Sequence, residues 1–319
     1  MKIIGLGKGI PKECVTNDQL SEFLDTNDEW IVSRTGIKTR YVCVGETLTD
    51  LSATAATDAL NKANLSAKDI DLIICTTICG DYCTPSLACC IAERINARCP
   101  AFDINAACTG FIYALELADG FIRVGKYKNI LIVSAEKMSA KVDWNDRNTC
   151  VLFGDGAAAC VVTEGESVKY INLSSSATPN TEVLNMPNGT GNSPFAAEKK
   201  QNEYLNMQGQ KVFKFVVNIV EAELKLMTER TGITPEQIDR FLLHQANKRI
   251  IDYTLARLKQ PAEKFPCNIE RYGNLSSASV PLLLTEMTET GQVKAGDTLL
   301  LCAFGGGLTA GTCVMTIDS

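Results

Sequence analysis

The chain has 319 residues, enough for one large domain or two domains of about 150 residues, and 45% of them are hydrophobic, which suits a globular protein. Its net charge of −6 argues against a general nucleic-acid-binding protein, although a local basic patch remains open. Glycines and a proline interrupt the N-terminal run, and no segment reaches the roughly 18 apolar residues of a membrane span. We therefore expect a cytoplasmic protein that binds neither nucleic acid nor membrane.

Strand-like and helical patterns alternate along the chain. In the first half, apolar strand-like runs at 67–77 and 128–136 flank a helical pattern that begins beside Cys108. Residues 174–203, rich in Ser, Thr, Asn, Pro and Gly, predict a loop or hairpin, after which the alternation resumes. The predicted helices are 51–63, 109–124, 209–230, 245–258 and 275–288.

Two pairs of segments repeat weakly within the chain. "AKDIDLIICTT" at 67–77 resembles "PEQIDRFLLHQ" at 235–245, and "LFGDGAAACVVTE" at 152–164 resembles "AFGGGLTAGTCVMTI" at 303–317. A duplicated α/β unit, with a largely buried mixed or parallel sheet in each half, is the simplest explanation. We therefore divide the chain into residues 1–168 and residues 169–319.

Fourteen cysteines raise the question of which of them takes part in chemistry. In a reducing compartment most should be small buried hydrophobic residues, as the apolar runs around Cys160, Cys302 and Cys313 indicate. A metal or redox site is a distant alternative, because the C-x₃-C-x₃-C series lacks the usual C-x₂-C spacing. That series consists of Cys75, Cys79 and Cys83.

Cys108 stands at a predicted strand-to-helix turn in "DINAACTGF". A thiol at the N-terminus of a helix meets the positive end of the helix dipole, which favours the thiolate, and its own N–H group can help to hold an oxyanion. The small residues Ala106, Ala107 and Gly110 let a substrate approach. Taken alone, the same pattern also fits a cysteine that is merely buried.

Two polar residues of the second half are candidate partners of Cys108. His244, the only histidine, follows the apolar run "RFLL" and so lies at the carboxyl end of a strand, where α/β sheets gather their sites. Asn274, in "RYGNLSSASVP", precedes a helical pattern. A structural histidine and a helix-capping asparagine are the alternatives on local grounds.

Four motifs in order, "DINAACTGF", "HQANKRI", "RYGNLSSASVP" and "AFGGGLTAG", together resemble β-ketoacyl-acyl-carrier-protein synthase III of the thiolase superfamily. The resemblance extends from "SEFLDTNDEWIVSRTGIKTRY" to the last glycine turn, nearly the whole chain. It implies an α/β, thiolase-like, layered αβαβα fold built from two duplicated halves with mixed five-stranded sheets. It also implies a homodimer.

The resemblance implies a decarboxylative condensation that initiates fatty acid biosynthesis. Cys108 takes an acyl group from an acyl-CoA primer, and malonyl-acyl carrier protein then enters in a ping-pong sequence without any further cofactor. His244 and Asn274 stabilise the charge left by decarboxylation, and the N–H groups of Cys108 and Gly306 form an oxyanion hole. A specialised relative that makes a polyketide or a quinolone-type product is the closest alternative.

The resemblance also assigns residues to CoA. Trp30 and Arg147 match a pair that sandwiches adenine, and Arg34 matches a phosphate contact. Without the family resemblance, a tryptophan packed on the surface and solvated arginines would be the simpler interpretation. The positions that match the pantetheine channel and its mouth are Phe213, Ala246, Asn247 and Arg249.

Binding of an acidic carrier protein to this acidic chain requires a local group of cations. We expect it at Lys211, Lys214, Lys248, Arg249 and Arg257, on two predicted helices. One position departs from the family pattern. Where several members have a bulky aromatic residue that limits the acyl pocket from across the dimer, this chain has Thr84, so we expect a deeper pocket that accepts longer or branched primers.

Overall fold

The first of two main β-sheets lies in the N-terminal half of the chain. The computed structural model describes residues 1–176, 181–187 and 204–318. β7 is antiparallel to its neighbours β1 and β6, whereas β4 is parallel to β5 and β6, so the predicted mixed five-stranded sheet is confirmed for this half. In sheet order the strands are β1 (Lys2–Gly9), β7 (Asp155–Thr163), β6 (Ile130–Lys137), β4 (Leu72–Thr76) and β5 (Ala101–Ile104).

The second sheet has four strands in the described part of the chain, one fewer than predicted. Its order is β11 (Arg240–Leu243), β12 (Thr298–Gly305), β13 (Thr309–Thr316) and β8 (Val168–Ser175). β11 and β12 are parallel and the other pairs are antiparallel. The segment that corresponds to β5, residues 265–268, is not a strand and contains Pro266, which has no N–H group to donate to a strand ladder.

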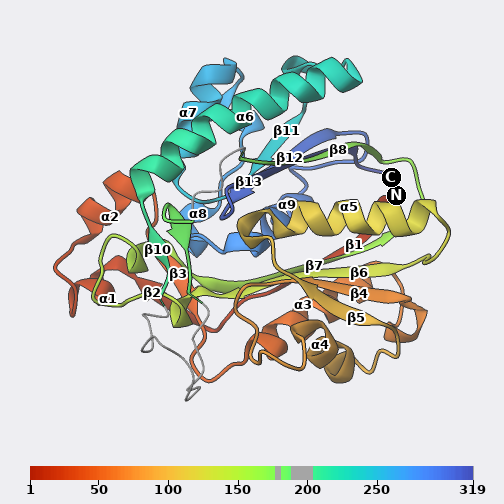
Figure 1. The fold of residues 1–319 in the computed structure, drawn as a ribbon, viewed down its shortest axis with the longest axis horizontal. Coiled ribbons are helices and arrows are strands. Elements are labelled where there is room, and N and C mark those ends of the chain that lie inside the picture. The colour runs from red at the N-terminus through yellow and green to blue at the C-terminus, as the bar shows by residue number, and fades with distance from the viewer. Residues whose placement is uncertain (177–180, 188–203, 319) are drawn as a thin grey trace, which may run out of the picture.

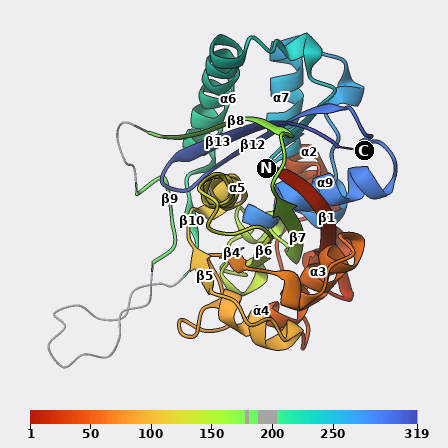
Figure 2. The same ribbon diagram turned by 90° about the vertical axis from the view of Figure 1, so that its right-hand side faces the viewer.

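Helices form three layers around the two sheets (Figure 1). The outer layers are α3 (Leu48–Lys62) with α4 (Leu87–Ile95) on the first sheet, and α6 (Gly209–Thr231) with α7 (Lys248–Leu258) on the second. The layer between the sheets contains α5 (Gly110–Arg123) and α9 (Ser279–Glu289), and Figure 2 shows α5 end-on in that position. The predicted αβαβα arrangement is confirmed.

The composition of α5 explains why it occupies the central layer. Its apolar residues recur at helical spacing and belong to one buried cluster with residues of both sheets. Each sheet presents an apolar face to the helix, so α5 buries side chains on more than one side. Members of this cluster include Phe111, Ile112 and Leu115 of α5, Ile74 and Ile132 of the first sheet, and Leu299 and Leu301 of the second.

The predicted helices are confirmed, with shifts of a few residues at their ends. α7 begins at Lys248 rather than at residue 245, because the Asn247 side chain accepts a hydrogen bond from the Arg249 N–H group and caps the helix. α9 begins at Ser279 because a short 3₁₀ turn, Ser276–Ala278, precedes it.

Short elements complete the fold. β9 and β10 pair with each other, whereas residues 177–180 and 188–203 of the predicted loop or hairpin lie outside the described residues. β8 already belongs to the second sheet, and the division of the chain at residue 168 stays a prediction. The short elements are β2 (Glu13–Thr16), α1 (Asn17–Ser21), α2 (Asp28–Thr35), β3 (Thr39–Val42), β9 (Leu184–Asn185), β10 (Asn206–Met207) and α8 (Ile269–Tyr272).

Candidate active site

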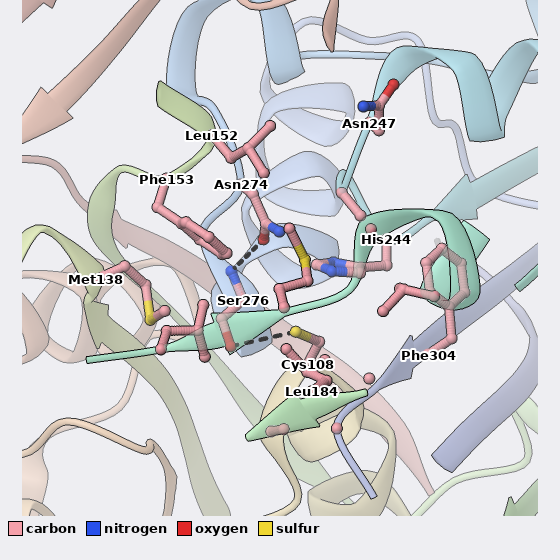
Figure 3. Close-up of a pocket in the computed structure, with 18 of the residues that line it drawn as sticks. Cys108, Met138, Leu152, Phe153, Leu184, His244, Asn247, Asn274, Ser276 and Phe304 are labelled. Atoms are coloured by element: carbon pink, nitrogen blue, oxygen red, sulfur yellow. Dashed lines mark hydrogen bonds between the residues drawn. The ribbon is translucent and has the colours of Figure 1, made fainter. Parts of the chain in front are cut away.

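One pocket of about 820 Å³ collects residues from both halves of the chain (Figure 3). Cys108 follows β5, His244 follows β11, and Gly306 follows β12, so three strand ends contribute to it. Asn274, between α8 and α9, also lines it. The structure therefore brings together the residues that the sequence singles out as a nucleophile and its two polar partners.

The backbone around Cys108 holds the thiol at the floor of this pocket. Cys108 lies in a 3₁₀ turn, Ala107–Thr109, at the start of α5, and Ala107 adopts the left-handed conformation with φ of 46°. Gly305 packs against the turn: a Cβ atom there would stand 2.9 Å from the Cys108 nitrogen. A glycine at position 305 is thus what lets β12 approach the nucleophile so closely.

The resting state of Cys108 differs from the sequence expectation. Burial raises the pKa of this thiol to about 12, and the negative charge of Glu136 acts in the same direction. The Cys108 thiol donates a hydrogen bond to the Ser276 hydroxyl, with 3.5 Å between Sγ and Oγ. Burial therefore favours the neutral thiol over the thiolate that the sequence analysis expects.

His244 is buried beside the pocket in a neutral form. Its backbone N–H donates to the Cys302 carbonyl at 2.8 Å, and its ring meets the edge of Phe304 at a centroid distance of 5.3 Å. Burial lowers the pKa of the imidazole to about 3, so the ring carries no charge at neutral pH. The Nδ1 atom is buried and has no hydrogen-bond partner in the described part of the chain.

The Asn274 side chain is oriented by the turn that follows it. Its Oδ1 accepts a hydrogen bond from the Ser276 N–H at 2.8 Å, while its backbone N–H donates to the Leu152 carbonyl. The amide nitrogen consequently lies on the side away from Ser276, toward His244 (Figure 3). Asn274 does not cap α9, since the Ala278 and Ser279 positions begin that helix.

Two residues of this site escaped the sequence analysis. Ser276 touches the Cys108 thiol and itself donates to Glu136 Oε1 at 3.1 Å. Glu136, at the end of β6, has no exposed surface. The only signal in the sequence was the position of a single acidic residue after the apolar run "ILIVSA", because a carboxylate in a buried strand must have hydrogen-bond partners.

The residues assigned to CoA divide into two groups. Arg147 does not line the pocket; its guanidinium carbon lies 5.1 Å from the centroid of the Trp30 ring, directly over the indole. An adenine ring stacked between the two groups would need them roughly 7 Å apart, which is twice the optimal separation of two carbon atoms. The space between Trp30 and Arg147 is therefore too narrow for adenine in this structure. The residues that do line the pocket are Trp30, Arg34, Phe213, Ala246, Asn247 and Arg249.

The predicted docking cations also differ among themselves. Lys248 forms an ion pair with Asp252, and Arg257 forms two hydrogen bonds of 3.1 Å with Glu221. Lys211, Lys214 and Arg249 are exposed, and no ion pair involving them occurs among the described residues. Arg249 instead lies over the Phe213 ring at 5.9 Å.

The position that departs from the family pattern, Thr84, is exposed and does not line the pocket of its own chain. Thr84 therefore makes no direct contribution to this pocket from within its own chain.

The remaining cysteines lie outside the pocket. All fourteen are free thiols, and Cys160, Cys302 and Cys313 are buried in strands, as predicted. Within residues 1–176, 181–187 and 204–318, no group of three or more His, Cys, Asp and Glu side chains is arranged to hold a metal ion. In the same ranges no helix has both the length and the apolar character needed to cross a membrane.

Comparisons with known proteins agree with the site and the fold. Residues 102–179 match the sequence profile described as 3-oxoacyl-[acyl-carrier-protein] synthase III, and residues 228–317 match its C-terminal profile. The β-ketoacyl-[acyl-carrier-protein] synthase III of Clostridium perfringens is 46% identical over 99% of both chains. The crystal structure of 3-oxoacyl-[acyl-carrier-protein] synthase III from Aquifex aeolicus superposes with a TM-score of 0.92 at 43% identity, again over 99% of both chains.

A structure from another pathway is similar as well. The priming β-ketosynthase of the R1128 polyketide pathway superposes with a TM-score of 0.91 at 31% identity, covering 100% of this chain and 96% of that one. Near-complete coverage in both directions, together with identities above 40% to the synthases themselves, identifies the family. The chain belongs to the β-ketoacyl-[acyl-carrier-protein] synthase III family of condensing acyltransferases.

Proposed function

We propose that this chain condenses an acyl-CoA primer with malonyl-acyl carrier protein, with loss of CO₂, and so initiates fatty acid biosynthesis. The observation that carries the proposal is the meeting of Cys108, His244 and Asn274 in one pocket. A nucleophile beside two neutral hydrogen-bond donors suits a reaction that forms a thioester on the enzyme and then develops charge on a second thioester. The chemistry needs these side chains and the two substrates, and no further cofactor.

The first half-reaction forms an acyl-enzyme on Cys108. The sulfur attacks the thioester carbonyl of acyl-CoA, CoA leaves, and the acyl group stays on the cysteine. The N–H groups of Cys108 and Gly306 would hold the oxyanion of the tetrahedral intermediate. In support of this role, Cys108 and Gly306 line the same pocket.

The second half-reaction forms the new carbon–carbon bond. Loss of CO₂ from the malonyl group leaves negative charge on its thioester oxygen, to which the Asn274 amide and the His244 imidazole donate hydrogen bonds. His244 suits this role because its pKa near 3 keeps it neutral. Its unpaired, buried Nδ1 favours a proton on Nε2, since an unpaired buried N–H is rarer than an unpaired acceptor. The enolate carbon then attacks the acyl-cysteine carbonyl and releases Cys108.

Binding of CoA would use the residues at the pocket and its mouth. Trp30 offers an indole face, Arg34 a phosphate contact, and Phe213, Ala246, Asn247 and Arg249 a channel wall. Adenine would displace Arg147 from the indole rather than enter a preformed slot, because the two side chains already touch. We retain Lys211, Lys214 and Arg249 as the principal contacts for an acidic carrier protein, while the paired Lys248 and Arg257 contribute less.

A synthase that primes polyketide formation is the second candidate. It is favoured by the likeness to the R1128 priming β-ketosynthase at 31% identity. The higher identity to the Clostridium perfringens synthase III, 46%, supports fatty acid initiation instead. The product released from a natural carrier protein distinguishes the two pathways.

We further propose a cytoplasmic homodimer with a deep acyl pocket. Fourteen free thiols suit a reducing compartment, and the exposed segment around Tyr82 and Thr84 is the proposed dimer contact. In such a dimer the small Thr84 side chain would leave space for longer or branched primers. Acylation rates with acetyl-, butyryl- and hexanoyl-CoA test this point, because a strict preference for acetyl-CoA contradicts an opened pocket.

Intact-protein mass spectrometry tests the proposed function directly. The chain is incubated with each acyl-CoA and weighed, malonyl-acyl carrier protein is added, and the product is identified. We expect one added acyl group that disappears when the extender arrives and that is absent from Cys108→Ala. Cys89→Ala, which alters an exposed cysteine outside the pocket, is the matched control and should be acylated normally. Acylation that persists in Cys108→Ala would falsify the proposal.

A further inference from the structure

A buried hydrogen-bond network extends from the Cys108 thiol into the core. Cys108 Sγ donates to Ser276 Oγ at 3.5 Å, and Ser276 Oγ donates to Glu136 Oε1 at 3.1 Å. Ser277 Oγ donates to the same oxygen at 2.7 Å. The other carboxylate oxygen, Oε2, accepts from Cys79 Sγ at 3.0 Å, from the Ile78 N–H at 3.1 Å and from Thr77 Oγ1 at 3.4 Å.

Glu136 has no cationic partner among the described residues. It is completely buried, and no ion pair to it occurs in the ranges that the structure describes. Hydrogen bonds alone hold its charge, and burial raises its pKa. Uptake of a proton would remove this buried charge, so Glu136 is suited to accept one.

The other groups near Cys108 are poor proton acceptors. Burial lowers the pKa of His244 to about 3, so its imidazolium would be a strong acid. Burial raises the pKa of the thiols of Cys75 and Cys79 well above its ordinary value, so both stay protonated and have no free site for a second proton. A thiolate formed beside an ionised Glu136 would place two like charges in one buried site, which is costly.

We propose that Glu136, acting through Ser276, accepts the Cys108 thiol proton during acylation. As sulfur attacks the thioester carbon, its proton moves to Ser276 Oγ, and the Ser276 hydroxyl proton moves to Glu136 Oε1. The bond from carbon to the CoA sulfur then breaks, and the proton returns through Ser276 to that departing sulfur, which leaves as the thiol. Net charge in the site stays at minus one throughout, so no second buried charge is created. Ser276 Oγ first accepts a proton from the Cys108 sulfur and later donates one to the CoA sulfur. Glu136 does not touch the substrate and acts only through Ser276, so it is a positioning residue.

This relay rests on the proposed acylation of Cys108, and the dependence of single-turnover acylation on pH tests it. In the wild type the rate should be nearly constant from pH 6.5 to 8.5, because the proton stays inside the site. In Glu136→Gln and in Ser276→Ala the reaction must wait for a preformed thiolate. We expect acylation by butyryl-CoA about 10²-fold slower at pH 7, within the range of general-base effects, and a rate that rises about tenfold with each pH unit.

A double-mutant cycle separates a relay from a structural role. If Glu136 acts through Ser276, the double variant Glu136→Gln/Ser276→Ala should be no slower than Ser276→Ala alone. Glu223→Gln is the matched control, because Glu223 is another buried carboxylate held by hydrogen bonds, from Ser174 and Thr312, outside the pocket. It should acylate within about twofold of the wild type at every pH, whatever its effect on thermal stability.

Each outcome decides the matter. Flat pH profiles for Glu136→Gln and Ser276→Ala, or losses that multiply in the double variant, would overturn the relay while leaving acylation of Cys108 intact. A wild-type chain that is never acylated at Cys108 would overturn the proposed function and the relay with it. If Glu136→Gln does not fold, Ser276→Ala alone decides, because it keeps the carboxylate and four of its donors.

Discussion

Gly305 and Cys108 are in direct backbone contact across the two halves of the molecule. A Cβ atom at position 305 would lie 2.9 Å from the Cys108 nitrogen and 3.0 Å from its Cβ atom, closer than side chains tolerate. The nucleophile turn and the end of β12 are therefore positioned by each other. This contact fixes the distance between Cys108 and the N–H of Gly306.

Gly305→Ala should impair acylation severely. The added methyl group must push the Cys108 turn away from β12, and a displacement of about 1 Å costs on the order of 10²-fold in rate. Single-turnover acylation followed by mass spectrometry measures the effect. At Gly306 an added Cβ would meet Ala107 Cβ at 3.5 Å and Leu184 side-chain atoms at 3.8 Å, all ordinary contacts, so Gly306→Ala should lose less activity. Equal losses in the two variants would contradict the packing argument.

Asn274→Asp should stop decarboxylation while leaving acylation of Cys108 nearly intact. The substitution replaces an amide donor with a carboxylate at the point where the enolate oxygen gains charge, and loss of one such donor costs about 10²–10³-fold. Release of labelled CO₂ from malonyl-acyl carrier protein measures this step. Asn27→Asp, the same change at the capping position of α2 and outside the pocket, should cost far less. A variant slow in acylation but normal in CO₂ release would exclude the assigned role.

The buried His244 should make the folded chain less stable in acid. Its pKa is near 3 in the folded chain and about 6.5 when exposed, so below pH 6.5 the unfolded chain binds a proton that the folded chain does not. The free energy of unfolding is therefore highest above pH 6.5 and falls as the pH decreases below that value, by at most about 1.4 kcal/mol per pH unit for this one group. Thermal melts at pH 7 and pH 5 check this prediction. The melting temperature of His244→Gln should fall less between pH 7 and pH 5 than that of the wild type, and equal falls in both proteins would contradict it.

Lys214→Glu should weaken the use of malonyl-acyl carrier protein. Lys214 is exposed on α6 beside the pocket residue Phe213, and reversal of its charge repels an acidic partner. We expect KM for the carrier protein to rise about fivefold at low salt, and by less in 0.5 M salt, since screening is then strong. Lys225→Glu makes the same charge change farther along α6 and should have little effect. An equal rise in both variants would point to net charge rather than to a docking site.

Gly120→Ala should stabilise the chain. Gly120 lies within α5, is exposed, and an added Cβ would find no atom within 4 Å. Alanine in a helix interior is favoured over glycine by about 1 kcal/mol. Gly110→Ala is the contrasting variant at the start of the same helix. Its added Cβ would lie 2.9 Å from Thr76 Cβ, so this substitution should destabilise the fold. Urea denaturation of the two variants measures both signs, and a loss of stability in Gly120→Ala would refute this reasoning.

Local patterns in the sequence determined the alternation of strands and helices and singled out Cys108, His244 and Asn274, and the family resemblance implied the layered fold. Helical spacing of apolar residues located α5, the internal repeat indicated two sheets, and the strand ends before Cys108 and His244 indicated where a site would form. Chain position placed each residue at the carboxyl end of a strand, where one edge of a sheet gathers functional groups. Cys108 follows a strand of the first sheet and His244 a strand of the second, so only folding brings the two together. The missing fifth strand of the second sheet was also visible in principle, at Pro266.

The tertiary structure alone decided the chemical state of the site. Desolvation depends on everything that surrounds a group, so the neutral thiol of Cys108 and the neutral ring of His244 follow from burial and not from their neighbours in sequence. The link from Cys108 through Ser276 to Glu136 joins residues 140 and 168 positions apart. Only folding brings β6, the start of α5 and the turn before α9 together, and with them the groups that control the proton of the nucleophile.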